Sequence, residues 1–584
     1  MIRKLIRQML AAQTLSALTV SLCLLIDNIM ICRYLGVQAA AAYGLANPIL
    51  LVIGAIGSML AAGVQVACSR SLGSGSREET DKGYSSAIGL TLAVSLFFVA
   101  LVTLFCGPLA TLMGAGGEGR LFERTRDYMT GFILGAPGSI GALILVPFLQ
   151  MAGQSSLLIA AVLGMTVSDV ALDLLNVFVF KGDMFGMGLA SSISYYVAVA
   201  VALVYFLSKK CVFRFSFKLI TWKKIRELAA GGLPAVFNMA SSVVLVFILN
   251  KILMAAGGSE AVAAYTVLMG IGNASNCIST GVGGVSLTLS GILYNEEDQT
   301  GLKELLKLLT RYSAVLGAAV GVLLAALAPA LVGVFIAKAG EAREMTVQGV
   351  RLFALALIPC CINNALKSLY QGTDRWGLTE IISVLEGAVL PSLAAFLFSR
   401  WLQVTGVWLC FVTGECLTLL CIMLFVWRKN QRAVLSPGPF LLLKEGFGVK
   451  PEELMEMDIH SVQEVTEAAR KAADFCRLHG QSERMANHIA LCIEEMAGNT
   501  VIHGFSKDKE NHLSVRVQHK QDRWVLRFRD DCWAFDPVSY VPKNDREDAL
   551  GIRLVMAMAE DVRYTYSMNL NNLTIKLPAA EKAA

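Results

Sequence analysis

Residues 84–117 read YSSAIGLTLAVSLFFVALVTLFCGPLATLMGAGG and contain no charged side chain. A membrane-spanning helix needs about 20 consecutive, mostly apolar residues. The stretch is therefore long enough to cross a bilayer, and it carries no group that would be costly to place there. Because similar apolar runs recur up to about residue 430, we expect most of the chain to lie in lipid.

The composition supports this expectation. The 584 residues are 55% hydrophobic and only 16% charged, whereas a soluble globular protein has about 25% charged residues. The 14 cysteines contain no CxxC pair and lie mostly in apolar runs, so they indicate small apolar positions and not a disulfide framework or metal site. The net charge of +5 is modest and gives no reason to expect nucleic acid as a partner.

About twelve segments before residue 430 meet the length criterion for a span. Their approximate limits are 10–33, 44–68, 84–112, 128–152, 156–180, 184–208, 231–256, 262–292, 311–337, 346–370, 377–400 and 405–427. The pattern predicts an all-α polytopic membrane protein with twelve transmembrane helices.

Basic residues predict the orientation of these spans. They gather before the first span and after the second, the sixth and the last. The groups are Arg3, Lys4 and Arg7; Arg70, Arg77 and Lys82; Lys209, Lys210, Arg214, Lys218, Lys223, Lys224 and Arg226; and Arg428, Lys429 and Arg432. With twelve spans all four groups fall on one side, which the positive-inside rule makes the cytoplasm. We expect a multi-pass plasma-membrane protein with cytoplasmic N- and C-termini, and we interpret the basic N-terminus as the flank of the first span and not as a removed signal peptide.

Short matches indicate an internal repeat. Ala41-Ala42-Tyr43 matches Ala263-Ala264-Tyr265 at an offset of 222 (263 − 41), and Gln150 matches Gln371 at an offset of 221 (371 − 150). Six spans per half would make the halves parallel repeats about an axis along the membrane normal. The sequence therefore predicts two six-helix lobes, over residues 1–208 and 209–430, that rock around a central cavity.

Several motifs recur in the order and spacing of a known family. They are Asp27-Asn28, Leu35-Gly36, Ala41-Ala42-Tyr43, Pro48, SRSLGSG at 69–75, GGLPA at 231–235, YQG at 370–372, GVW at 406–408 and Gly414-Glu415. Over residues 5–430 the chain resembles the multidrug and toxin extrusion (MATE) transporters. The resemblance implies a two-lobed antiporter that exports organic, often cationic, compounds in exchange for protons or sodium.

Carboxylates within the spans are candidate ion-coupling residues, because an ionisable group is costly in the bilayer. Asp27 and Asp173 each lie 17 residues beyond the estimated cytoplasmic start of a span (27 − 10 and 173 − 156), so we expect them at similar depth. Asp169 precedes Asp173 by one turn on the same helix face. A proton or sodium ion would relieve the repulsion between such carboxylates, and the resemblance places acidic residues at Asp27 and Asp173. Alternatively, Asp169 or Asp173 caps a kink or faces an outer vestibule.

Two further carboxylates, Glu386 and Glu415, also fall within spans. For Glu415 we favour an inter-helix hydrogen bond over contact with substrate.

The chain becomes polar after residue 430, and all six of its histidines lie there. Residues 431–450, with Ser-Pro-Gly-Pro at 436–439, are interpreted as a linker. Residues 451–584 show the pattern of a small α/β domain. We expect helices at 461–478, 482–504 and 549–560, a hairpin of strands at 513–517 and 524–528, and two short strands at the end.

Residues 493–504 read IEEMAGNTVIHG and place Glu495, Asn499 and His503 on one helix face at i, i+4 and i+8. A carboxylate can act as a base and an amide oxygen can ligate Mg²⁺, although such a face is often only solvated surface. With DDCWAFDP at 530–537 and ALGIRLV at 549–555, the region resembles the GHKL ATPase fold, an α/β sandwich, in its anti-sigma-factor serine kinase form. The resemblance implies Glu495 as catalytic base, Asn499 on Mg²⁺, Asp530 on the adenine amino group and Gly551 at the phosphates of ATP, with His503 beside them.

The chain departs from that family where glycine is expected, at Cys532 and Ala549. A side chain at these positions restricts close backbone approach, and the lid segment 538–548 contains no glycine. Two alternatives stay open: the domain binds ATP and Mg²⁺, with or without serine kinase turnover, or it is a degenerate fold used for protein contact.

Three functions are consistent with these patterns. The first is a secondary active exporter of small organic compounds with a cytoplasmic regulatory domain, which could also bind a regulator protein. The second is a membrane sensor whose C-terminal domain acts as a serine kinase or anti-sigma-type switch. The third is a flippase for a lipid-linked precursor. Direct ATP-driven transport is disfavoured, because the chain has no Walker phosphate loop.

Overall fold

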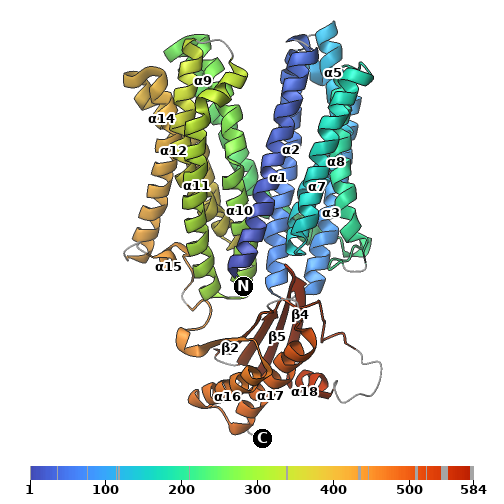
Figure 1. Ribbon diagram of the computed structural model, residues 1–584, viewed down its shortest axis with the longest axis vertical. Helices are drawn as coiled ribbons and strands as arrows, with labels where there is room; N and C mark the ends of the chain where they lie inside the picture. Colours follow the sequence, from blue (N-terminus) through green and yellow to red (C-terminus); the bar gives the residue numbers. More distant parts are fainter. Residues whose placement is uncertain are drawn as a thin grey trace.

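Two bundles of long helices stand side by side above a small sheet domain (Figure 1). The structure is a computed structural model. It describes residues 2–35, 37–74, 76–113, 115, 119–208, 211–336, 340–431, 436–444, 446–506, 511–520, 523–540 and 550–578.

The first bundle, called the N lobe below, is formed by the helices before residue 208. They are α1 (Ile2–Met30), α2 (Val37–Gly73), α3 (Arg77–Leu104), α4 (Cys106–Leu112), α5 (Arg120–Ile133), α6 (Ala136–Met151), α7 (Ser155–Leu174) and α8 (Met184–Phe206). Short π-helical segments at Ile31–Leu35 and Leu175–Val179 extend α1 and α7. Helices α5 and α6 meet at an angle of 45°.

The second bundle, called the C lobe, contains two helices that are too long to cross a membrane once. Its elements are α9 (Trp222–Ser275), α10 (Cys277–Asn295), α11 (Gln299–Phe335), α12 (Glu341–Gly372), α13 (Trp376–Val384), a π segment (Leu385–Val389) and α14 (Leu390–Asn430). Helix α9 breaks at Gly258, with φ of 63°, and α14 breaks at Gln403, with φ of 49°. A Cβ atom on Gly406 would lie 2.3 Å from the carbonyl oxygen of Phe398, so the chain doubles back at the second break.

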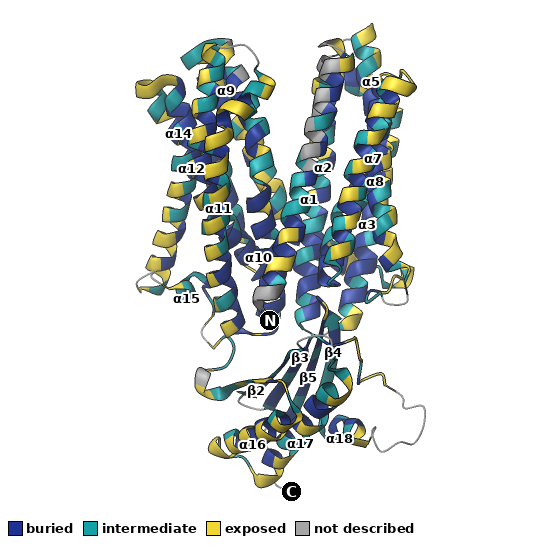
Figure 2. Ribbon diagram, viewed as in Figure 1, coloured by how far each residue is buried: buried dark blue, intermediate teal, exposed yellow. Residues whose placement is uncertain are grey.

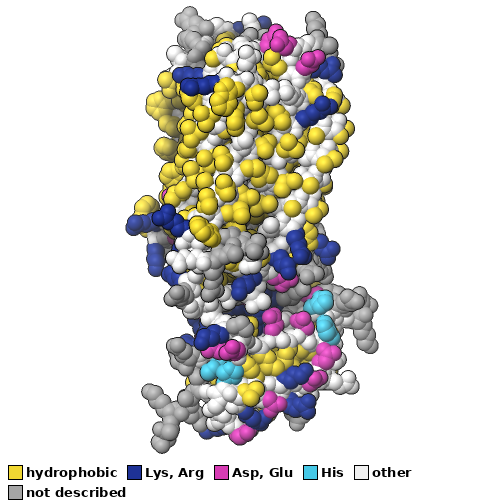
Figure 3. All heavy atoms as spheres, turned by 90° about the vertical axis from the view of Figure 1, so that its left-hand side faces the viewer, with side chains coloured by type: hydrophobic (Ala, Val, Ile, Leu, Met, Phe, Trp, Pro, Cys, Tyr) yellow, Lys and Arg dark blue, Asp and Glu magenta, His cyan; other side chains and the backbone are white. Residues whose placement is uncertain are grey.

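The helical part has the surface of a membrane protein. Among the described residues, nine helices are long and apolar enough to cross a membrane, and the bent pair α5 and α6 adds a tenth span if it is counted as one. Figure 3 shows apolar side chains over the middle of this part and lysines and arginines near its two ends. The prediction of an all-α architecture with many membrane-spanning helices is therefore confirmed, whereas the exact number of twelve spans is not.

The two lobes touch at the end that faces the sheet domain. Gly63 on α2 packs so closely on α9 that a Cβ atom there would lie 2.0 Å from the carbonyl oxygen of Leu228. Nearby, Arg70 of the N lobe forms an ion pair with Asp374 of the C lobe at 2.7 Å. Toward the opposite end the helices of the two lobes diverge (Figure 1). The lobes are therefore closed on the side of the sheet domain.

The C-terminal domain is one antiparallel sheet with helices on one face (Figure 1). Its elements are β1 (Leu454–Ile459), α16 (Val462–Leu478), α17 (Glu483–Asn499), a π segment (Thr500–Gly504), β2 (Leu513–Lys520), β3 (Arg523–Asp530), α18 (Leu550–Met558), β4 (Asp561–Ser567) and β5 (Leu570–Pro578), preceded by the short helix α15 (Pro437–Phe440). The five strands are ordered β1-β2-β3-β5-β4. The expected α/β sandwich and its hairpin of β2 and β3 are confirmed, while β1 was not expected from the sequence.

Strand alternation explains the two faces of this sheet. Val515 and Trp524, which are 0% exposed, point toward the helices, as do their neighbours two residues along each strand. The outward faces of α16 and α17 are solvent-exposed in Figure 2. Ser461 and Ser482 cap these helices by accepting hydrogen bonds from Glu464 N–H and Met485 N–H, which stabilises the helix starts.

We predict that Gly63→Ala weakens the contact between the lobes. The added methyl group would overlap the backbone of α9, and overpacking of this kind costs about 1–3 kcal/mol. The measurement is the apparent melting temperature of the detergent-solubilised protein. Gly54→Ala in the same helix is the matched control, because a Cβ there meets nothing within 4 Å. Equal melting temperatures for the two variants would contradict the close approach of α2 and α9.

Candidate functional sites

Three buried carboxylates meet inside the N lobe. Asp27 on α1 and Asp169 and Asp173 on α7 are 4%, 2% and 0% exposed. The Asp27 carboxyl group lies within hydrogen-bonding reach of both aspartates on α7. The structure therefore brings together the three predicted residues, although their role in ion coupling stays a prediction.

Few hydrogen-bond donors reach these carboxylates. Ser191 Oγ on α8 donates to Asp27 Oδ2 at 3.3 Å. Asp27 Oδ1, Asp169 Oδ1 and both oxygens of Asp173 have no donor within the part of the chain that the structure describes. Two ionised carboxylates share no hydrogen, so their contact is stable only when a proton or a cation lies between them.

The space beside the carboxylates is small. Its volume is about 10 Å³, which is room for one water molecule or a small ion and not for an organic compound. The lining residues are Cys23, Asp27, Tyr128, Phe132, Met165, Asp169, Ser191, Ser194 and Tyr195. Ser191 and Ser194 were missed from the sequence, and the signal that could have identified them is the polar Ser-Ser-Ile-Ser run at 191–194 within an apolar helix.

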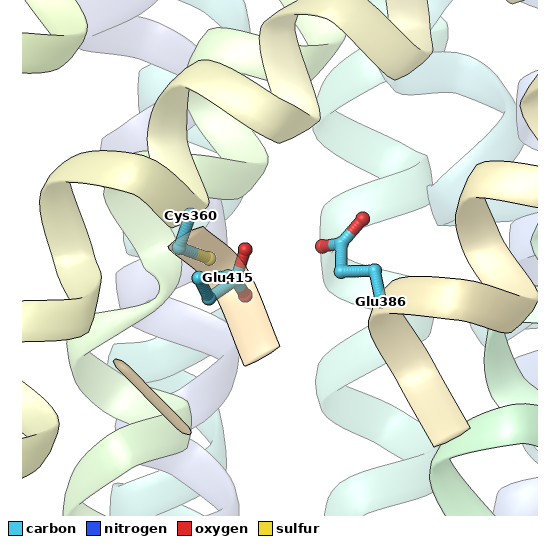
Figure 4. Close-up of side chains that lie close together, drawn as sticks. All are labelled: Cys360, Glu386 and Glu415. Carbon is cyan, nitrogen blue, oxygen red and sulfur yellow. The ribbon is translucent and has the colours of Figure 1, made fainter. Parts of the chain in front are cut away.

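A second buried group of polar side chains lies in the C lobe. One ligand atom from each of Cys360, Glu386 and Glu415 lies within 4.8 Å of the others, and Figure 4 shows these side chains between helices of the lobe. Here the carboxylates have partners. Glu386 pairs with Lys367 at 3.1 Å, and Glu415 accepts a hydrogen bond from Asn363 Nδ2 at 2.7 Å. The Glu415 contact joins α12 to α14 and is the inter-helix bond expected from the sequence.

The C-terminal domain contains a cavity of about 480 Å³, which is large enough for a nucleotide-sized ligand. Its described lining is Met496, Asn499, Thr500, His503, Gly504, Phe528, Asp530, Cys532, Trp533, Ala534, Phe535, Pro537, Tyr540, Ile552, Tyr564, Asn571 and Leu573. Three of the predicted nucleotide-binding residues, Asn499, His503 and Asp530, therefore line one cavity.

Asp530 ends β3 and is held in place by two donors. Its Oδ1 accepts hydrogen bonds from Asn571 Nδ2 at 2.7 Å and from Cys532 N–H at 3.0 Å. Burial raises the pKa of Asp530, while these two hydrogen bonds act in the opposite direction. Asn571 lies in β5 and was not identified from the sequence, because no short motif links it to Asp530.

Glu495 and Gly551 contact each other. A Cβ atom on Gly551 would lie 1.7 Å from Glu495 Oε2, so a side chain at this position would displace the Glu495 carboxylate. Neither residue is part of the described cavity lining, although the spacing placed Glu495 on one face with Asn499 and His503. The α-helix ends at Asn499 and continues as a π-helical turn over Thr500–Gly504, in which His503 lies. Residues 541–549, with Ala549 and most of the expected lid, lie outside the described residues.

Cys532 occupies a wall of the cavity. A Cβ atom on Gly504 would lie 3.1 Å from its sulfur, so the Cys532 side chain fills space beside the turn after α17. The departure from glycine therefore changes the shape of the site without closing the cavity.

Comparison with known proteins agrees with both halves of this description. Residues 13–175 match the MatE family model, and residues 460–577 match the model described as histidine kinase-like ATPase domain.

Known relatives cover the helical part. The multidrug export protein MepA of Staphylococcus saprophyticus is 26% identical over 428 residues, which are 71% of this chain and 91% of the relative. The outward-facing structure of a multidrug resistance MATE family transporter of the MOP superfamily is 19% identical with a TM-score of 0.68, and it covers 73% of this chain and 95% of that chain. A MOP superfamily transporter from Pyrococcus furiosus is 19% identical with a TM-score of 0.67, and the match covers 76% of this chain and 97% of that chain.

The fold and these matches define a polytopic helical membrane protein joined to an ATPase-type domain. More specifically, the helical part is similar to MATE multidrug export proteins, with a MatE family match over residues 13–175, and a match to the histidine kinase-like ATPase domain follows it.

We predict that the full-length protein binds Mg-ATP and that Asp530→Asn lowers its affinity by about 10- to 100-fold, because the substitution removes one hydrogen bond to a charged group. The donors on Asn571 and Cys532 would hold the amide oxygen, so the amide NH₂ would face the adenine amino group. The measurement is titration with a fluorescent ATP analogue in detergent. Asp531→Asn is the control, because Asp531 lies outside this cavity lining. Unchanged affinity of Asp530→Asn would place the nucleotide elsewhere.

Proposed function

We propose that the protein is a secondary active exporter of small organic compounds, coupled to protons or sodium at Asp27, Asp169 and Asp173. The observation that carries this proposal is the group of buried carboxylate oxygens without donors. A proton or Na⁺ would neutralise the site and stabilise one arrangement of α1 against α7. Loss of that ion would restore the repulsion and favour another arrangement, so an ion gradient could drive a cycle.

The cargo would bind elsewhere, because the space at the carboxylates holds only a small ion. The relatives are called multidrug export proteins, and on that basis we propose organic, mainly cationic, compounds as the cargo. The space between the lobes is the proposed route. Alternating closure of its two ends would expose the cargo first to one side of the membrane and then to the other.

We propose twelve spans in two lobes of six. The nine apolar helices become twelve (9 + 3) when α1, the bent pair α5 and α6, and the arm of α14 beyond Gln403 are each counted as a span. The basic residues at the ends of the spans then favour a plasma-membrane protein with cytoplasmic termini. The sheet domain would lie on the side of the membrane where ATP is present.

We propose that the C-terminal domain binds ATP and Mg²⁺ and regulates export. Asn499 would ligate Mg²⁺ through its amide oxygen, His503 would lie beside the phosphates and Asp530 would accept from the adenine amino group. Glu495 and Gly551 lie next to this cavity and would approach the phosphate end. Gly504, Cys532 and Trp533 line both this cavity and a second one of about 490 Å³ that reaches Leu5 and Gln8 of α1, so a bound nucleotide would lie close to the membrane part.

We predict that Asp27→Asn and Asp173→Asn each abolish gradient-driven export. Asparagine keeps the shape of the side chain but cannot exchange a proton or balance the charge of a sodium ion. The measurement is efflux of a panel of cationic dyes from proteoliposomes with imposed proton or sodium gradients.

Asp127→Asn is the matched control for this experiment. Asp127 lies in the same lobe, but its side chain is 44% exposed, so export should stay at the wild-type rate. Wild-type export by both Asp27→Asn and Asp173→Asn would rule out the proposed ion site.

A further inference from the structure

The outer face of the C-terminal sheet is strongly basic. Arg516 in β2 lies directly opposite Arg527 in β3, and Arg529 follows two residues further along the same face. Like charges at cross-strand positions destabilise a sheet. This face therefore needs acidic partners, and it points away from the helices of its own domain and toward the membrane part (Figure 1).

Acidic partners come from the turn between α10 and α11 of the C lobe. Arg529 Nη2 donates to both carboxylate oxygens of Glu296 at 2.6 Å. Arg516 Nη1 lies 2.6 Å from Asp298 Oδ2, and Lys520 pairs with Glu297.

These charged groups are shielded from water. The Glu296 and Asp298 side chains are 7% and 2% exposed, and charge-assisted pairs are strong in such surroundings. Burial alone would raise the pKa of Asp298, but Arg516 and the N–H of Gly301 outweigh it, so the pKa lies below its usual range. We call this contact the C-lobe anchor.

The same sheet also contacts the N lobe. The turn between β4 and β5 donates from Met568 N–H to the carbonyl oxygen of Met151 at 2.7 Å and from Asn569 Nδ2 to that of Gly153 at 2.9 Å. Arg563 Nη1 donates to the carbonyl oxygen of Ser74 at 2.8 Å. We call this contact the N-lobe anchor.

The two anchors are joined by a rigid path. Arg529 of the C-lobe anchor pairs with Asn572 of β5 in the sheet register, and its Nε donates to Asn572 Oδ1 at 2.6 Å. Asn572 lies three residues from Asn569 of the N-lobe anchor. Because a hydrogen-bonded sheet with a packed core changes shape little, the docked domain fixes the separation between the turns of the two lobes.

From this geometry we propose that the C-terminal domain is a clamp that holds the two lobes closed on its own side of the membrane. The proposal rests on the proposed transport cycle, in which the lobes separate on that side. The direct contacts between the lobes at Gly63 and at the Arg70–Asp374 pair would open in that step. The docked sheet opposes it, so at least one anchor has to be released in each cycle.

The test measures the separation of the lobes by double electron–electron resonance in the full-length protein. Spin labels replace Glu78 at the start of α3 and Lys307 on α11, with the exposed Cys416 and Cys421 changed to serine. Glu296→Arg should place like charges opposite Arg529 and release the C-lobe anchor. We expect a population with longer label-to-label distances that the wild type lacks. The double variant Glu296→Arg, Arg529→Glu restores opposite charges at the two positions, so this population should disappear.

A second variant and a control distinguish release of an anchor from misfolding of the protein. Arg563→Ala combined with Asn569→Ala removes the two side-chain bonds of the N-lobe anchor, together with the exposed Arg563–Asp561 pair within the sheet, and should also produce the longer distances. Glu344→Arg makes the same charge change at an exposed position of the C lobe and should leave the distribution unchanged.

Labels at Lys471 and Lys307 report whether the domain has left the C lobe. A released domain with wild-type separation of the lobes would overturn the clamp. This readout does not depend on transport, so wild-type export by both Asp27→Asn and Asp173→Asn would reject the proposed ion site and leave the clamp to be judged on the measured distances.

Discussion

The energetic cost of an unpaired charge away from water explains where the charged side chains of this protein lie. In the C lobe, Glu386 and Glu415 are matched by Lys367 and Asn363. At the junction of the two parts, arginines of the sheet are matched by an acidic turn. In the N lobe, by contrast, one oxygen each of Asp27 and Asp169 and both oxygens of Asp173 have no donor within the described chain. In the proposed transport cycle, these unsatisfied acceptors would bind a proton or a cation reversibly.

The sequence predicted the parts of the fold that depend on local pattern. Apolar runs of span length and the alternation in the hairpin of β2 and β3 each follow from neighbouring residues. Strand β1 was missed because Leu454–Ile459 alternates acidic residues with methionines and resembles an extended linker. The breaks at Gly258 and Gln403 were expected only as gaps between spans, and the structure shows them as sharp changes of backbone direction.

The candidate sites were predictable where the functional side chains lie within one short motif. Asp27, Asp169 and Asp173 were identified because carboxylates are rare in apolar runs, whereas Ser191 contributes through a helix far away in the sequence. In the C-terminal domain, Asp530 was identified from its motif, whereas Asn571 lies opposite Asp530 on the neighbouring strand β5 and is distant from it in the sequence. Docking of the domain on the C lobe depends on complementary charges more than 200 residues apart, as between Glu296 and Arg529, and no local pattern reveals such a pairing.

Covalent linkage gives the docked domain a property that two separate proteins would lack. The linker connects the end of α14 to β1, so the basic face of the sheet is always near the acidic turn, at an effective concentration in the millimolar range typical of short tethers. An interface of a few ion pairs and backbone hydrogen bonds would then be occupied for a larger share of the time than the same interface between two separate proteins. It could still dissociate and re-form rapidly, independently of how much protein the cell makes.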